Sequence, residues 1–245
     1  MAKPINVEGT ALYNYTEGYG SYLIPAVMMI IIFQTLLMVI GMVTGEEYSS
    51  KGIRAYTPLG YGWGVAIRIV AGKTSVYCTL YAIFAFFLLG LLPHFFSIPN
   101  IGNGLYIVLL LIPYLMATSF LGLAASRYFT DSEAPLLMIA FFSVGLIFLS
   151  GVSYPMELMI AFFSVGLIFL SGVSYPMELM PWYWKVAHYI FPAAPGTLAF
   201  VKLNSMGASM ADIRPEYITL WIQALIYFTI SIWVYKKKLE SNLIS

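Results

Sequence analysis

"SYLIPAVMMIIIFQTLLMVIGMV", residues 21–43, contains no charged side chain in 23 positions. An α-helix needs about 20 predominantly apolar residues to cross the hydrocarbon core of a bilayer. Pro25 falls in the first turns of this stretch, where a missing backbone N–H is tolerated. The stretch therefore predicts a transmembrane helix.

The composition of the whole chain agrees with a membrane environment. Of its 245 residues, 60% are hydrophobic and only 9% are charged, whereas soluble domains carry roughly 25% charged residues. The net charge of +1 argues against a nucleic-acid partner, which requires a clustered basic surface. The single cysteine, Cys78, excludes an internal disulfide and leaves no zinc-binding spacing. We expect an integral membrane protein.

Four further stretches have the length and apolar character of a span. Three of them are 75–92, 104–125 and 217–235, and a fourth begins at Pro135, where either 135–152 or 158–173 crosses the membrane. We expect an all-α integral membrane protein, a bundle of about five transmembrane helices plus a re-entrant or interfacial outer hairpin.

The distribution of Lys and Arg predicts the orientation, because cytoplasmic loops are enriched in these residues. Cations gather in 44–74, after the third span and at the chain end, at Lys51, Arg54, Arg68, Lys73, Arg127, Lys236, Lys237 and Lys238. We therefore place 44–74, 126–134 and the tail 236–245 in the cytoplasm, and the amino-terminal segment 1–20 and the loop 181–216 outside. The expected location is the cell (inner) membrane.

A perfect tandem repeat interrupts this pattern. Residues 137–159 recur without substitution at 158–180. If one copy spans, the chain crosses five times and its basic tail ends inside; if both span, the tail ends outside, against the charge rule. We predict that one copy spans and that the other is surplus. Alternatively, the second copy forms a re-entrant or interfacial hairpin, because Ser-Gly-Val-Ser-Tyr-Pro breaks a helix. Whether the duplication is native or an artefact stays open.

With one repeat unit removed, the carboxy-terminal half contains a recognisable order of motifs. A span ends in Ser-Gly-x-x-x-Pro-x-Glu-x-Met-Pro, "FPAAP" follows, and the last span has a basic end. Upstream lie "LYNYTEGYGSYLIPAVMMIIIFQTLL", "TGEEYSSKGIR" and "AGKTSVY". Over nearly all of 11–240 this order resembles ABC-2 type transporter permeases, the membrane subunits of ABC exporters. Their usual first span and large outer domain have no counterpart before Asn14, so we expect a shortened form or a second chain that supplies them.

The resemblance implies a permease subunit that moves an amphiphilic, drug-like, lipid-linked or polymeric substrate outward. No GxxxxGK[ST] loop occurs in the chain, so we expect ATP to be used by a separate ABC ATPase subunit. We also expect no catalytic, cofactor or metal site in this chain. The other expected partners are a second permease subunit, identical or not, and membrane lipid. The alternative is a non-transporting membrane anchor or assembly subunit.

The segment 44–74 is the candidate for docking the ATPase. Its acids and bases are spaced to share a helix face, and by resemblance this is the coupling region. The alternative is a solvated loop whose cations only satisfy the inside-positive rule. The candidate coupling residues are Glu46, Glu47, Lys51, Gly52 and Arg54.

A second candidate region lies at the outer end of the repeat. Acids at membrane depth are costly and often functional, although a wet outer boundary or a hairpin cap would use the same residues. By resemblance this region is an outer gate or re-entrant segment; the neighbouring aromatic residues alternatively form an interfacial belt. The candidates are Pro155, Glu157, Pro176, Glu178, Pro181 and Trp182. His94 and His188 are isolated and lack metal-ligand spacing.

Overall fold

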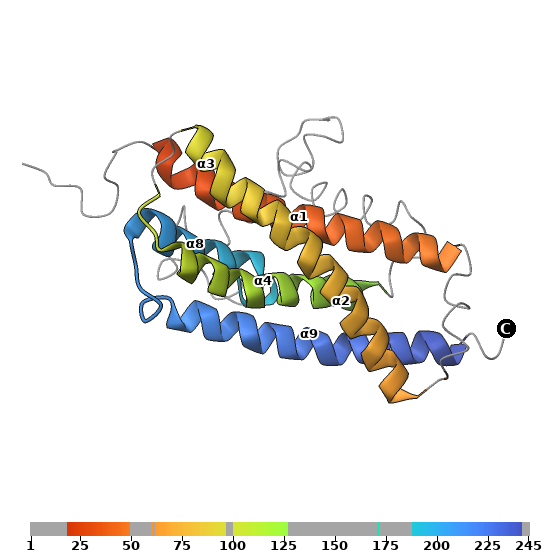
Figure 1. The fold of residues 1–245 in the computed structure, drawn as a ribbon. Helices are drawn as coiled ribbons and strands as arrows, with labels where there is room; N and C mark the ends of the chain where they lie inside the picture. Colours follow the sequence, from red (N-terminus) through yellow and green to blue (C-terminus); the bar gives the residue numbers. More distant parts are fainter. Residues whose placement is uncertain are drawn as a thin grey trace, which may run out of the picture.

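The computed structural model describes residues 19–49, 60, 62–96, 100–126, 171 and 188–241, and within these residues it contains helices and turns but no strand (Figure 1). The helices are α1 (Tyr19–Ser49), α2 (Trp63–Ala85), the π-helix η2 (Phe86–Leu91), α3 (Leu92–Phe95), α4 (Gly104–Ala125), α8 (Ala193–Met206) and α9 (Arg214–Ser241). The α2, η2 and α3 segments form one continuous helical unit, Trp63–Phe95, which we call the α2 unit.

Four of these elements are long and apolar enough to cross a membrane, namely Ile24–Glu47 within α1, the α2 unit, α4 and α9. They contain the predicted spans 21–43, 75–92, 104–125 and 217–235. The prediction of an all-α integral membrane protein is confirmed. The fifth predicted span, in 135–152 or 158–173, lies outside the described residues except for residue 171.

Helices α1 and α2 both extend into the segment 44–74, which the sequence predicted as a loop. Helix α1 continues to Ser49 and α2 already begins at Trp63, so much of this segment is helical rather than loop. The prediction ended the spans at their first charged residues. An α-helix satisfies its own backbone hydrogen bonds whether or not its side chains are apolar, so it extends past the hydrocarbon boundary.

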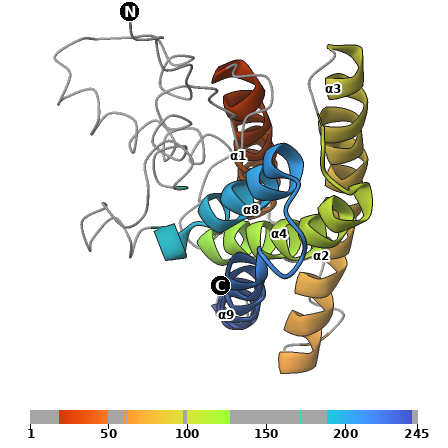
Figure 2. The same cartoon turned by 90° about the vertical axis from the view of Figure 1, so that its left-hand side faces the viewer.

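Helix α4 lies at the centre of the bundle, beside α1, α2, α8 and α9 (Figure 2). Half of its residues are buried, including Pro113 and the whole side chain of Tyr114. The Tyr114 hydroxyl donates a hydrogen bond to the carbonyl of Met29 in α1, 2.7 Å away. A buried hydroxyl needs such a partner, and this bond fixes α4 against α1 in the interior.

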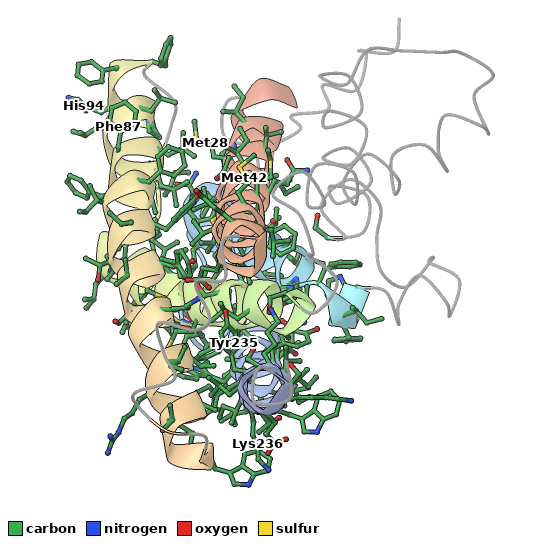
Figure 3. All side chains as sticks on the ribbon, turned by 90° about the vertical axis from the view of Figure 1, so that its right-hand side faces the viewer. Met28, Met42, Phe87, His94, Tyr235 and Lys236 are labelled. Carbon is green, nitrogen blue, oxygen red and sulfur yellow. The ribbon has the colours of Figure 1, made fainter. Side chains whose placement is uncertain are left out.

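The α2 unit crosses the other helices obliquely along one side of the bundle (Figures 1 and 2). Only 22% of its most apolar window is buried, so much of its surface is left for lipid or another chain. The π-helix lies in this unit, where the i→i+5 pattern adds a wider turn. Phe87 and His94 are on the exposed side of the unit (Figure 3).

Helix α8 lies within the segment 181–216, which the sequence predicted as an outer loop. It has 14 residues, ten of them buried, and a length of about 21 Å, which is too short to cross a core of about 30 Å. A Cβ on Gly196 would lie 2.2 Å from the Tyr114 ring, so glycine is required where α8 approaches α4. The helix ends at Gly207, whose left-handed φ of 63° suits a glycine cap.

Candidate functional site

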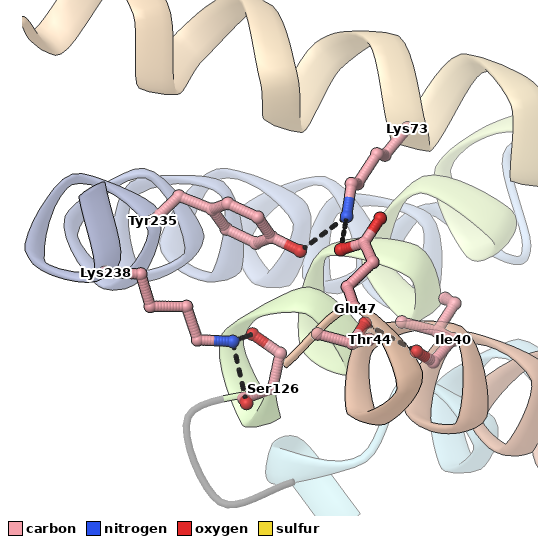
Figure 4. Close-up of polar contacts among 7 residues, drawn as sticks. All are labelled: Ile40, Thr44, Glu47, Lys73, Ser126, Tyr235 and Lys238. Atoms are coloured by element: carbon pink, nitrogen blue, oxygen red, sulfur yellow. Dashed lines mark hydrogen bonds and ion pairs between the residues drawn. The ribbon is translucent and has the colours of Figure 1, made fainter. Parts of the chain in front are cut away.

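Five polar residues from four helices meet where α1, α4 and α9 end (Figure 4). We call this group the end cluster; its members are Glu47, Lys73, Ser126, Tyr235 and Lys238. The residues that follow α1 and α4 lead into the two connections predicted to be cytoplasmic. The cluster therefore lies at the base of both connections and next to the basic tail.

An ion pair joins α1 to α2 in this cluster. The ammonium group of Lys73 pairs with the Glu47 carboxylate and also donates to the hydroxyl of Tyr235, 3.1 Å away. The two charged side chains are only 12% and 20% exposed, so water screens the pair weakly. The pair holds the end of α1 against α2, and Tyr235 adds α9 to the contact.

Lys238 attaches α9 to the end of α4. Its ammonium group donates to the backbone carbonyl and the hydroxyl of Ser126, at 2.9 and 3.1 Å. The last carbonyls of a helix have no intrahelical partner and carry partial negative charge. Lys238 therefore provides a hydrogen-bond donor to a carbonyl at the end of α4 and places a positive charge next to its partial negative charge.

Tyr235 lies between the two lysines of the cluster. The ammonium groups of Lys73 and Lys238 are 5.0 and 5.4 Å from its ring centroid, within the range of a cation–π contact. One buried aromatic ring thus links the α1–α2 ion pair to the α4–α9 contact. A displacement of α1 or α2 changes the environment of both lysines.

The predicted coupling residues fall partly in this cluster. Glu47 is a member, whereas Glu46 beside it is exposed; Lys51, Gly52 and Arg54 lie outside the described residues. From the sequence, Lys73 was counted only among the cations that predict the orientation, and Tyr235 was assigned no role. A lysine set between apolar runs, "RIVAGKTSVYC", was the available signal that this charge needs a buried partner.

A helix break near the middle of the bundle forms a second polar group. The turn 188–190 is helical, the chain bends at Phe191 and Pro192, and α8 starts at Ala193. The Gln223 amide donates to the carbonyl of Tyr189, 2.8 Å away, and the Tyr227 hydroxyl donates to that of Ile190. Carbonyls freed by a break inside a membrane need such donors.

Neighbouring contacts show that this break lies level with the middle of α1. The ring of Phe191 meets that of Phe33, in the middle of α1, edge to face. The opposite end of α8 lies beside the start of α4, where the Ile101 amide donates to the carbonyl of Asn204 at 3.1 Å. Helix α8 therefore runs from the level of the middle of α1 to one end of the bundle. The predicted gate residues Pro155, Glu157, Pro176, Glu178, Pro181 and Trp182 lie outside the described residues.

The charged side chains of the described residues include three ion pairs. Within this part of the chain, no group of three His, Cys, Asp or Glu side chains could hold a metal ion. His188 is buried and its ring meets that of Tyr189. Tyr235 and Lys238 of α9 take part in the end cluster, and Gln223 and Tyr227 of α9 donate to the helix break. Both polar groups therefore include α9.

Comparison with known proteins identifies a family match. A family model described as "ABC-2 family transporter protein" matches residues 1–164 and 158–233. Together the two ranges include α1, the α2 unit, α4, α8 and most of α9. No curated protein and no solved structure matches the chain.

Proposed function

The chain belongs to the ABC-2 transporter family, and from this premise we propose that it is the permease subunit of an ATP-driven exporter in the cell membrane. A separate ABC ATPase subunit uses the ATP, and a second permease subunit completes the pathway. The substrate is amphiphilic, drug-like, lipid-linked or polymeric, and it moves outward. The chain itself supplies no catalytic residue and no cofactor.

The observation that carries the coupling proposal is the Glu47–Lys73 ion pair. It lies at the base of the segment that joins α1 to α2, where the candidate residues Glu46, Lys51, Gly52 and Arg54 also fall. An ATPase docked on this segment would displace the ends of both helices. Through Tyr235 and Lys238 the displacement reaches α9 and α4, so the end cluster passes motion from the docking segment into the bundle.

The helix break before α8 supports the proposal that this region acts as an outer gate. Two hydrogen bonds to the carbonyls at this break come from Gln223 and Tyr227 of α9, the helix that also contributes to the end cluster. A shift of α9 would therefore act on the inner end of α8. The predicted gate residues at Pro176, Glu178 and Trp182 precede this break in the chain.

Co-expression with a candidate ABC ATPase tests the coupling segment. We expect the ATPase to copurify with the permease and its ATP hydrolysis to rise, and Glu46→Lys to weaken both effects because it reverses an exposed charge at the docking segment. Glu240→Lys is the matched control, since Glu240 is also exposed and lies at the same end of the bundle. Equal effects of the two reversals would refute the docking assignment. Binding without stimulated hydrolysis would favour the alternative, a non-transporting anchor or assembly subunit.

The family match supports a single working copy of the repeat. It divides into two ranges that overlap at 158–164, where the second copy begins, as expected if one family segment is written twice. We propose that deletion of 159–179 leaves membrane insertion and ATPase copurification intact. Loss of the folded protein on this deletion would show that the second copy is structural.

A further inference from the structure

A groove of about 640 Å³ runs between α1 and α2 on the side where the end cluster lies. Val39 and Val43 of α1 form one wall, and Val76 and Leu80 of α2 form the other. Val76 and Leu80 are each 57% exposed. The walls are thus apolar and open toward the surrounding bilayer.

Charge is confined to one end of this groove. Glu47, Arg68 and Lys73 line it there, and Glu47 and Lys73 neutralise each other in their ion pair. The guanidinium of Arg68 has no ion-pair partner among the residues that the structure describes. The groove therefore has one uncompensated positive charge at its polar end.

The dimensions of the groove fit one membrane leaflet. Arg68 and Leu80 are 12 positions apart on α2, a rise of about 18 Å, and half of a hydrocarbon core is about 15 Å. Trp63, five positions before Arg68, is 52% exposed and has the character of an interfacial anchor. Arg68 consequently lies close to the level of the headgroups.

We propose that this groove binds one anionic phospholipid of the cytoplasmic leaflet. The phosphate contacts the guanidinium of Arg68, whose planar donors match phosphate oxygens, and an acyl chain lies along Val39, Val43 and Val76. Basic pockets between transmembrane helices on the cytoplasmic side are suited to anionic headgroups. The site goes beyond the transport function and does not depend on it.

Native mass spectrometry of the full chain in detergent, with phosphatidylglycerol or phosphatidylcholine added, tests the headgroup contact. We expect one phosphatidylglycerol to be retained in preference to phosphatidylcholine, and Arg68→Gln to lower that preference about fivefold, the effect of one basic residue at a membrane surface. Arg214→Gln is the matched control, since Arg214 is exposed at the opposite end of α9. Equal retention by the two variants would overturn the assignment.

A second pair of variants tests the apolar part and adds atoms rather than removing a charge. Gly72 lines the groove, and a Cβ there meets nothing within 4 Å. Gly72→Leu should fill the groove while favouring the helix, and it should abolish retention of the lipid. Gly64→Leu, also in open space on α2, should leave retention unchanged. If Arg68→Gln fails to fold, the two glycine variants test the proposal on their own. Unchanged retention of the lipid in Gly72→Leu would overturn the proposal, and so would displacement of the lipid by inorganic phosphate.

Discussion

The ion pair between Glu47 and Lys73 can be measured with a double-mutant cycle. Removing one partner of a buried pair costs about 3–5 kcal/mol because the other charge is left uncompensated. The Glu47 and Lys73 side chains are 20% and 12% exposed, and Lys73 keeps its bond to Tyr235 when Glu47 is neutralised. We therefore expect Glu47→Gln and Lys73→Met each to lower the free energy of unfolding by about 2–3 kcal/mol.

The double variant should be destabilised by less than the sum of the two single variants. A coupling energy of about 1.5–2 kcal/mol is expected, which changes the unfolding equilibrium by roughly 10–30-fold. Unfolding in mixed detergent micelles, followed by circular dichroism over an SDS titration, provides the four free energies. Each variant is first shown to be monodisperse by size-exclusion chromatography.

A second pair on α9 serves as the control for this cycle. Lys236 and Glu240 are four positions apart, with 3.3 Å between Nζ and Oε1, and the Glu240 side chain is 50% exposed. An exposed helical pair of this kind contributes about 0.3–0.5 kcal/mol. Coupling between Glu47 and Lys73 no larger than the control value would refute the conclusion that their pair fastens α1 to α2.

Three further outcomes follow from individual contacts. Gly196→Ala should destabilise the protein by about 1–3 kcal/mol, because the new Cβ would overlap the Tyr114 ring, whereas Gly104→Ala, with open space around it, should be tolerated; equal thermal unfolding temperatures would contradict this. Ser231→Ala should cost about 1 kcal/mol, since its hydroxyl is 2.7 Å from the carbonyl of an α4 residue, and an unchanged SDS midpoint would exclude that bond. The backbone N–H and hydroxyl of the serine three positions earlier lower the pKa of Asp212 below 3.8, so its stabilising contribution is present above the unfolded pKa and disappears as the pH falls through the lowered folded value. The difference in melting temperature between the wild type and Asp212→Asn should therefore vanish in strong acid, and a difference independent of pH would contradict the assignment.

The membrane helices could be predicted from the sequence because their signal is local. Residues 21–43 and 104–125 are continuous apolar runs, and each lies within a described helix. The positions of the helix ends were harder to predict from the sequence, since charged residues such as Glu46 and Lys73 continue a helix as readily as they end it. Local composition therefore identified the spans but not how far the helices extend beyond them.

Helix α8 and the end cluster could not be predicted, because both depend on packing. The sequence of α8 includes Pro195, Gly196 and Lys202 and has no long apolar run, and its burial arises from the space between α1, α4 and α9. Glu47 and Lys73 are 26 positions apart, and only the crossing of α1 and α2 brings them together. Lys202 and Glu216, 2.5 Å apart, form a similar contact near the other end of the bundle.

The short length of α8 has a consequence for the biogenesis of the protein. A 14-residue helix cannot partition into the bilayer as a span of its own, and the carbonyls of Tyr189 and Ile190 at its inner end receive their hydrogen bonds from Gln223 and Tyr227. Those donors are synthesised only after α8 has left the ribosomal peptidyl-transferase centre. The two carbonyls therefore gain their donors only after α9 has entered the membrane, and α9 completes the burial of α8.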